Sequence, residues 1–206
     1  MATLQFLGAI EGVTGSCYLL KTKTAKILID CGLFQGRREE EKGNAKPFKF
    51  IVNELDAVVL SHAHLDHSGR LPLLVLQGLN CPIYMTTPTN DLIEVLLKDA
   101  ASLQERDIEW KNKRLRRAGK KEVEPLYRLE DVEEALSQCE GIPYHQKKTI
   151  AQGINIRYLD AGHILGSAII EIYIDEDNVE KKLVFSGDLG NSQAALLQDP
   201  EVVESA

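Results

Sequence analysis

The stretch Leu60–Gly69, LSHAHLDHSG, gathers side chains that bind metal ions. His62, His64, Asp66 and His67 fall within six positions, and they include three of the five histidines in the chain. Imidazole suits zinc, and a mixture of imidazoles and carboxylates is typical of a catalytic site that keeps open coordination positions. Because chance seldom gathers most of a chain's histidines in so short a stretch, the sequence predicts a metal site here.

The elements on either side of this stretch should hold it in place. Ala57–Leu60 is an apolar run that predicts a buried strand. His62 and His64 are two positions apart on the chain that leaves this strand, so their side chains can point the same way. Asp66 and His67 occupy the turn that follows. A helix is predicted over Leu71–Gln77, with Pro72 near its start. The loop would then be fixed between a strand end and a helix start.

Two further candidate ligands stand where other predicted strands end. His163 lies in LDAGHILGSA after a predicted strand at Gly153–Leu159, and Asp188 lies in VFSGDLG after Lys182–Phe185. A lone histidine or aspartate beside glycine is more often a turn residue. Together with the histidine cluster, however, both fit one metal site, and the glycines allow close approach of the backbone.

The rest of the chain predicts strands, then helices, then strands, which indicates a mixed α/β fold. Antiparallel strands are expected at Thr3–Gly8, Ser16–Lys21 and Lys26–Asp30, and further strands at Cys81–Met85 and Ala168–Ile174, with a hairpin turn at Asp175–Glu180. A charged surface loop or short helix is expected over Cys31–Phe50. Amphipathic helices are expected from Thr89 to Ala118, capped by Thr87 or Thr89, and at Glu130–Cys139.

Seven cations gather at the end of the longer helix, namely Lys111, Lys113, Arg114, Arg116, Arg117, Lys120 and Lys121. One interpretation is a contact with nucleic acid. The other, which we favour from the sequence, is a solvated helix end whose positive charges suit the negative pole of the helix.

Composition limits the class of protein. The chain has 206 residues, 44% of them hydrophobic, and a formal net charge of −7, which argues against a protein that coats polyanions. Four scattered cysteines without a CxxC pair predict a reducing, cytoplasmic setting. The N-terminal segment has neither the pattern of a signal peptide nor that of a membrane anchor, so no membrane association is expected.

Three segments, HAHLDHSG, AGHILGSA and FSGDLG, resemble the metallo-β-lactamase superfamily of binuclear metal hydrolases, and they occur in the order typical of that superfamily. IDCGLFQG, HLDHSGRLP, PTNDL and GHILGSA are similar to its β-CASP branch, the nucleases that include RNase J and the mRNA 3′-end-processing endonuclease. The resemblance implies part of a four-layer αββα sandwich. Residues 1–206 would be the N-terminal portion of the metallo-β-lactamase domain, without the β-CASP insert and the C-terminal half.

The resemblance also implies roles for the candidate residues. The implied metal ligands are His62, His64 and His163 for a first zinc ion, Asp66 and His67 for a second, and Asp188 for both. Manganese or iron could replace zinc. Two such ions can share a hydroxide that attacks phosphorus in line, and Asp66 and Asp188 would be the catalytic acids. His145, in IPYHQKK, does not match the last histidine ligand of the family and is expected to be an ordinary polar residue.

The leading hypothesis is therefore a metal-dependent nuclease acting on RNA, or less favourably on single-stranded DNA. The first alternative is a hydrolase of small esters, thioesters or lactones, and the second is a non-catalytic interaction fragment. As a partial chain it is expected to be weakly active or inactive alone, to bind its first ion more tightly than its second, and to form a homodimer or associate through its incomplete sheet.

Overall fold

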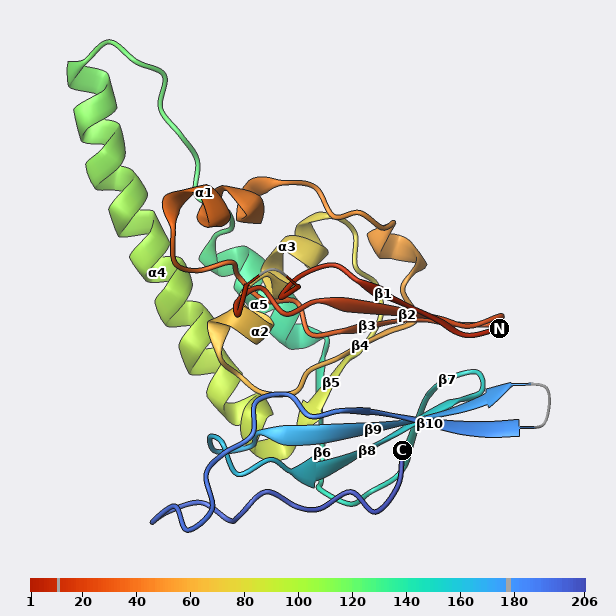
Figure 1. The fold of residues 1–206 in the computed structure, drawn as a ribbon. Coiled ribbons are helices and arrows are strands. Elements are labelled where there is room, and N and C mark those ends of the chain that lie inside the picture. Colours follow the sequence, from red (N-terminus) through yellow and green to blue (C-terminus); the bar gives the residue numbers. More distant parts are fainter. Residues whose placement is uncertain (11, 177–178) are drawn as a thin grey trace.

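Two β-sheets stack face to face, and helices cover the larger one, in the computed structural model, which describes residues 1–10, 12–176 and 179–206 (Figure 1). The larger sheet has the strand order β1 (Thr3–Phe6), β2 (Tyr18–Lys21), β3 (Lys26–Ile29), β4 (Ala57–Val59), β5 (Ile83–Thr86) and β6 (Cys139–Ile142). The smaller sheet has the order β10 (Val179–Phe185), β9 (Ala168–Glu176), β8 (Ile154–Asp160) and β7 (Lys148–Ala151).

The α-helices are α1 (Arg38–Glu41), α2 (Leu65–Ser68), α3 (Leu71–Leu76), α4 (Thr87–Arg117) and α5 (Leu129–Ser137), and two short 3₁₀ turns are η1 (Lys42–Ala45) and η2 (Val52–Glu54). The predicted mixed α/β fold is thus confirmed. None of the helices in the described part of the chain is long and apolar enough to cross a membrane.

Strand direction brings loop ends together at one edge of the larger sheet. β1, β2 and β3 are antiparallel, as predicted, whereas β3, β4, β5 and β6 run parallel to one another. The carboxyl ends of β3, β4 and β5 therefore lie side by side, and side chains that follow these strands can meet there. The smaller sheet is antiparallel throughout.

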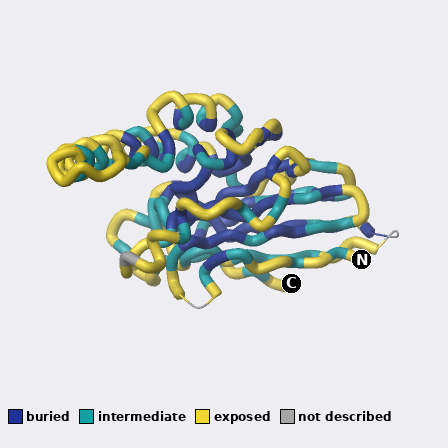
Figure 2. The backbone as a smooth tube through the Cα atoms, turned by 90° about the horizontal axis from the view of Figure 1, so that it is seen from above, coloured by how far each residue is buried: buried dark blue, intermediate teal, exposed yellow. Residues whose placement is uncertain are grey.

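Two apolar layers hold the sheets and helices together. Residues of β4 alternate between them: Val58 packs with the helices, whereas Ala57 and Val59 pack toward the smaller sheet. A strand that is covered on both faces is apolar throughout, which explains the unbroken run read in the sequence. Figure 2 shows the buried residues concentrated along the strands of the stacked sheets.

The long helix α4 begins two residues earlier than expected and buries only its first half. Its N-cap is Thr86, whose side-chain oxygen accepts a hydrogen bond from the backbone N–H of Thr89 at 3.2 Å, so the expected caps Thr87 and Thr89 were wrong. Thr86 has extended backbone angles suited to an N-cap. The fully buried side chains of α4 end at Ala101, and its second half extends away from the sheets (Figure 1).

Several other elements also differ from expectation. β6 and β7 were not predicted, because CEGI and KTIA are only four residues long and carry no clear alternation of apolar and polar residues. Cys139 belongs to β6 and not to the preceding helix, which ends at Ser137. β9 and β10 reach further than predicted, and the centre of the expected hairpin turn, residues 177–178, lies outside the described residues.

One end of the outer face of the smaller sheet is apolar, and there Leu159, Ile169 and Val184 pack with Val203. Further along it, the buried carboxylate of Glu171 accepts hydrogen bonds from Arg157 at 2.6 Å and Lys182 at 3.0 Å. The described residues thus form a helix layer and two sheet layers, and none of their helices covers this outer face.

Candidate metal centre

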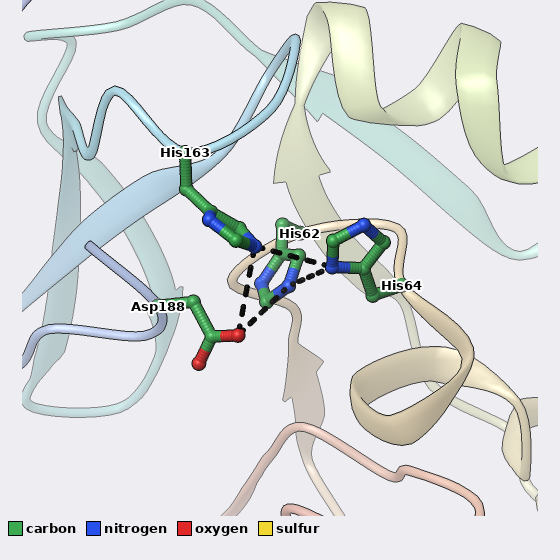
Figure 3. Close-up of side chains that lie close together, drawn as sticks. All are labelled: His62, His64, His163 and Asp188. Atoms are coloured by element: carbon green, nitrogen blue, oxygen red, sulfur yellow. Dashed lines mark hydrogen bonds and ion pairs between the residues drawn. The ribbon is translucent and has the colours of Figure 1, made fainter. Parts of the chain in front are cut away.

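Three histidines and one aspartate from three distant loops meet at the edge where β4 and β8 end (Figure 3). His64 Nδ1 lies 3.1 Å from His62 Nε2 and 3.2 Å from His163 Nε2. Asp188 Oδ2 lies 3.6 Å from His163 Nε2 and 3.8 Å from His62 Nε2. One ligand atom from each of the four residues falls within 4.8 Å of the others, so these atoms could surround a single cation.

The second group of predicted ligands lies on the other side of the Asp188 carboxylate. Its other oxygen, Oδ1, is 3.4 Å from His67 Nε2, and Asp66 Oδ2 is 3.9 Å from the same nitrogen. The two oxygens of Asp188 therefore face different imidazole groups. A carboxylate placed in this way would serve two neighbouring ions, and all six predicted residues are close together.

The loop that carries His163 is held by hydrogen bonds within the loop and from the start of α4. Ser167 Oγ accepts from the backbone N–H of His163 at 3.0 Å, and the hydroxyls of Thr86 and Thr89 donate to the carbonyl of Gly166 at 2.6 and 2.8 Å. The first turn of α4 thus fixes the loop. Gly166 has φ +82°, and a Cβ on it would lie 2.5 Å from the backbone nitrogen of Thr89, so glycine is required there.

The loop of Asp66 and His67 packs directly against the chain after β3. The backbone N–H of Cys31 donates to the carbonyl of His67 at 2.7 Å, and that of Ser16 donates to the carbonyl of Asp66 at 2.9 Å. A Cβ on Gly32 would lie 1.5 Å from the carbonyl oxygen of Asp66. The glycine of the IDCG segment is therefore needed for this contact.

Asp30 is a site residue that the sequence analysis did not identify. It is 2% exposed, and its Oδ2 accepts hydrogen bonds from His67 Nδ1 at 2.7 Å and from the hydroxyls of Ser16 and Ser61 at 3.0 Å each. Its Oδ1 accepts from the backbone N–H of Ser61 at 2.8 Å. The available signal was its place at the end of a buried strand, in IDCG, where parallel strands bring polar residues to one edge.

These contacts fix the tautomers of two histidines. In the neutral imidazole of His67, Nδ1–H donates a hydrogen bond to Asp30, so the lone pair is on Nε2, the atom that faces Asp66 and Asp188. Ser61 Oγ donates to Asp30 and can then accept from His62 Nδ1 at 3.0 Å, which leaves the lone pair of His62 on Nε2. A carboxylate or hydroxyl that orients a histidine in this way is typical of metal ligands.

The histidines differ in charge preference. Burial lowers the pKa of His62 to about 3, helped by the neighbouring His67, and burial also lowers the pKa of His64. Burial lowers the pKa of His67 too, but its hydrogen bond to Asp30 and the nearby carboxylates outweigh burial and leave that pKa raised. His62 and His64 are therefore neutral at pH 7, as metal ligands must be.

The donor set fits divalent metal ions. Imidazole nitrogens from three histidines converge with one carboxylate oxygen, and these are atoms that donate lone pairs to zinc and similar ions. A cation accepts all of them at once. The mixture of nitrogen and oxygen donors suits zinc, manganese or iron, and it does not single out one of them.

A cavity of about 270 Å³ opens beside this cluster, and its lining includes His67, Asp188, Tyr18 and Phe185. A reacting group could enter here next to the candidate ligands. His145 does not take part: it is exposed, and its Nε2 lies 3.6 Å from Glu201 Oε1, as expected for a polar surface residue.

Comparison with characterised proteins reveals relatives with RNA-related names. The chain is 38% identical over 195 residues to Ribonuclease TTHA0252 of Thermus thermophilus, covering 95% of this chain and 39% of that protein. It is 35% identical to Transcription termination factor FttA of Methanosarcina mazei, over 95% of this chain and 28% of the factor. It is 31% identical to an RNase J-like protein of Methanocaldococcus jannaschii, over 99% of this chain and 41% of that protein. The chain thus spans less than half the length of these relatives.

Solved structures share the fold at low sequence identity. A Cronobacter sakazakii metallo-β-lactamase with a HARLDQ motif aligns with a TM-score of 0.56 at 17% identity, over 94% of this chain and 62% of that one. The FEZ-1 metallo-β-lactamase of Legionella gormanii aligns with a TM-score of 0.53 at 16% identity, over 94% and 64% of the two chains.

The family model of the metallo-β-lactamase superfamily domain matches residues 19–205, which include all six candidate ligands. The ribonuclease, FttA and RNase J-like relatives agree with the β-CASP branch expected from the sequence motifs. By its fold, its motifs and these matches, the chain belongs to the metallo-β-lactamase superfamily.

Proposed function

We propose that this chain carries the metal-binding part of a nuclease that hydrolyses phosphodiester bonds in RNA. The observation that carries the proposal is the Asp188 carboxylate, one oxygen of which faces the three-histidine group while the other faces His67. A shared carboxylate between two metal positions suits an in-line displacement at phosphorus. The names of the relatives, a ribonuclease and an RNase J-like protein, favour RNA as the substrate.

Each candidate residue has a role in this proposal. His62, His64 and His163 would hold the first ion, Asp66 and His67 would hold the second, and Asp188 would be shared by both. Zinc is the ion we propose, with manganese or iron as substitutes. When bound, two such ions lower the pKa of a water molecule and stabilise the negative charge on a phosphoryl oxygen.

Side chains of the protein orient the metal-binding histidines and provide carboxylates that accept protons. Asp30 and Ser61 keep the ring nitrogens of His67 and His62 in the tautomers that leave Nε2 free. Asp66 and Asp188 are the carboxylates in this space that can accept the proton of the attacking water. The cavity beside His67 gives the phosphate a path to them.

We infer that the second ion binds more weakly than the first. Three imidazoles and Asp188 converge on the first position, whereas Asp66, His67 and the shared Asp188 are the described side chains that face the second. Activity of this 206-residue chain alone should accordingly be low.

We also propose that the chain associates with a second copy through the partly apolar outer face of the smaller sheet. Sedimentation of the purified chain measures this association.

A cytoplasmic location completes the proposal. All four cysteines are free thiols, and three of them are buried. Unpaired cysteines suit a reducing compartment, in which RNA substrates are also present.

The function is tested with labelled single-stranded RNA and the purified chain, in the presence of Zn²⁺ or Mn²⁺. His64→Ala should lower the cleavage rate by more than about 100-fold, because it removes a ligand and not merely a residue that orients one. His145→Ala is the matched control and should cleave at the unchanged rate. The function is wrong if the chain cleaves small thioesters or lactones but leaves RNA and bis(p-nitrophenyl) phosphate intact, or if the wild-type chain cleaves RNA and His64→Ala cleaves it at the same rate.

A further inference from the structure

One face of the second half of α4 combines an exposed aromatic ring with cations. Trp110, Lys113, Arg114 and Arg117 follow one another at intervals of three, one and three residues. Residues three, four and seven apart lie on the same side of an α-helix. We call these four residues the basic stripe.

The basic stripe is exposed and stands apart from the core. Trp110 is the one tryptophan of the chain, and it is 69% exposed. Tryptophan is usually largely buried, so an exposed ring of this size indicates a contact surface. This part of α4 extends away from the sheets in Figure 1, and Figure 2 shows its outer turns mostly exposed.

The fold uses the opposite face of the helix. Asn112 donates to the carbonyl of Val123 and accepts from its backbone N–H, both at 2.9 Å, so the returning loop packs on that side. The ion pair between Arg116 and Glu122, at 3.4 Å, lies there as well. Packing of α4 therefore does not explain the basic stripe.

The charges of the basic stripe are largely available. Lys113 lies 3.0 Å from Glu109, but both side chains are about half exposed, and the ammonium group is also 5.3 Å from the centre of the Trp110 ring. Arg114 and Arg117 form no ion pair with the residues that the structure describes. The basic stripe is therefore a locally positive surface, with an aromatic ring beside it, on a protein whose net charge is −7.

We propose that the basic stripe binds single-stranded RNA, with a base stacked on Trp110 and phosphates paired with Arg114 and Arg117. Stacking of bases on aromatic rings and pairing of phosphates with cations is how proteins hold single strands without reading sequence. A purely electrostatic role for the cations at the helix end needs no tryptophan. The proposal goes beyond cleavage, because binding at the stripe requires no metal ion.

The stripe would act at a distance from the metal centre. Thr86, which supports the His163 loop, and Trp110 are separated by about 36 Å of helix at 1.5 Å per residue. A strand bound at both places must therefore extend well beyond the bond that is cut. Short oligonucleotides should gain nothing from the stripe when cleavage is measured.

The direct test is the fluorescence of Trp110, measured on the 206-residue chain in EDTA so that no cleavage occurs. Titration with a single-stranded RNA of about 16 nucleotides should quench the emission, because a stacked base contacts the ring. Polyphosphate of equal charge should quench little, since it has no bases. Equal quenching by RNA and by polyphosphate overturns the proposal, and so does the absence of quenching by RNA.

Variants locate the contact. With fluorescently labelled RNA, Trp110→Ala should weaken binding by about 5- to 150-fold, the range expected for loss of one stacked base, and Trp110→Phe should restore most of it. Arg114→Glu with Arg117→Glu should also reduce the slope of log affinity against log salt by about 1.4. Lys147→Glu with Lys181→Glu, which changes net charge equally at the far end of the smaller sheet, is the control.

Folding is followed by thermal melting of each variant. Because Trp110 is exposed, Trp110→Ala should retain the wild-type melting temperature while it loses affinity. RNA binding that is unchanged in Trp110→Ala, or that falls equally in the Lys147 and Lys181 control, contradicts the assignment.

Discussion

Replacement of Asp30 by asparagine tests how the fold prepares His67 to bind a metal ion. Asp30 has φ +55°, a conformation that asparagine also adopts, so the backbone should not change. The amide can still accept the backbone N–H of Ser61 through its oxygen. It then presents an NH₂ donor, and not an acceptor, to His67 Nδ1.

The expected cost follows from the tautomer. If the NH₂ group of the introduced amide donates to His67 Nδ1, the imidazole proton must move to Nε2, which faces Asp66 and Asp188 and would no longer have a lone pair. Loss of a partner that orients a metal-binding histidine costs about 10- to 100-fold in metal affinity. This corresponds to about 1.4–2.7 kcal/mol, and it should fall mainly on the second ion.

Titration calorimetry of the metal-free chain with Zn²⁺ and with Mn²⁺ measures both steps of binding. Asp56→Asn is the matched control, because Asp56 is exposed at the opposite end of β4 and accepts a hydrogen bond from the backbone N–H of Lys26 at 2.7 Å. The control should bind like the wild type. An Asp30→Asn protein whose two affinities both lie within twofold of the wild type would refute the role of Asp30.

Three further predictions concern a glycine beside the centre, a buried carboxylate of the smaller sheet and a surface histidine. Gly32→Ala should lower the free energy of unfolding by about 3 kcal/mol and weaken metal binding, because its Cβ would lie 1.5 Å from the carbonyl oxygen of Asp66. Thermal melting with and without Zn²⁺ measures both effects. An unchanged melting temperature contradicts the close contact. The ionised carboxylate of Glu171, which is hydrogen-bonded to Arg157, should stabilise the fold when the pH is above the ordinary pKa of a glutamate, and this stabilisation should be lost on acidification. Although burial raises the pKa of Glu171, its hydrogen bonds lower it to about 2 from 4.5, so stability should fall as the pH drops from about 4.5 to about 2. Glu171→Gln should lower the free energy of unfolding by about 3 kcal/mol at pH 7 and remove the fall in stability between about pH 4.5 and pH 2. Denaturant unfolding at several pH values measures both. A Gln variant that is as stable as the wild type at every pH contradicts the prediction. His145→Ala should leave both metal affinities unchanged, and a loss of either ion would place a ligand where the structure has a surface residue.

The sequence was sufficient to predict the six candidate ligands because their types and spacing are local signals. Three histidines and an aspartate in six positions, and single ligands flanked by glycines after strands, are visible without knowledge of the fold. The structure adds that these loops meet at one edge. The loop of His62 follows β4, and the loops of His163 and Asp188 follow β8 and β10, which run in the same direction on either side of β9.

Asp30 could not be recognised in the same way. Its role depends on a contact with His67 across 37 positions, which arises only when β3 and β4 pair side by side. β6 and β7 were missed for a related reason: each is four residues long and takes its stability from a neighbouring strand and not from its own pattern. The cap of α4 was misplaced because Thr86, Thr87 and Thr89 are equivalent by type, and only the backbone angles distinguish them.

The most direct test of the metal centre is anomalous X-ray diffraction from crystals of the chain grown with Zn²⁺. The account predicts two peaks about 3.5–4 Å apart, with Asp188 between them. The stronger peak should lie among His62, His64 and His163, and the weaker one beside Asp66 and His67. A single peak that Asp188 does not contact, or ions bound away from these residues, would contradict the account.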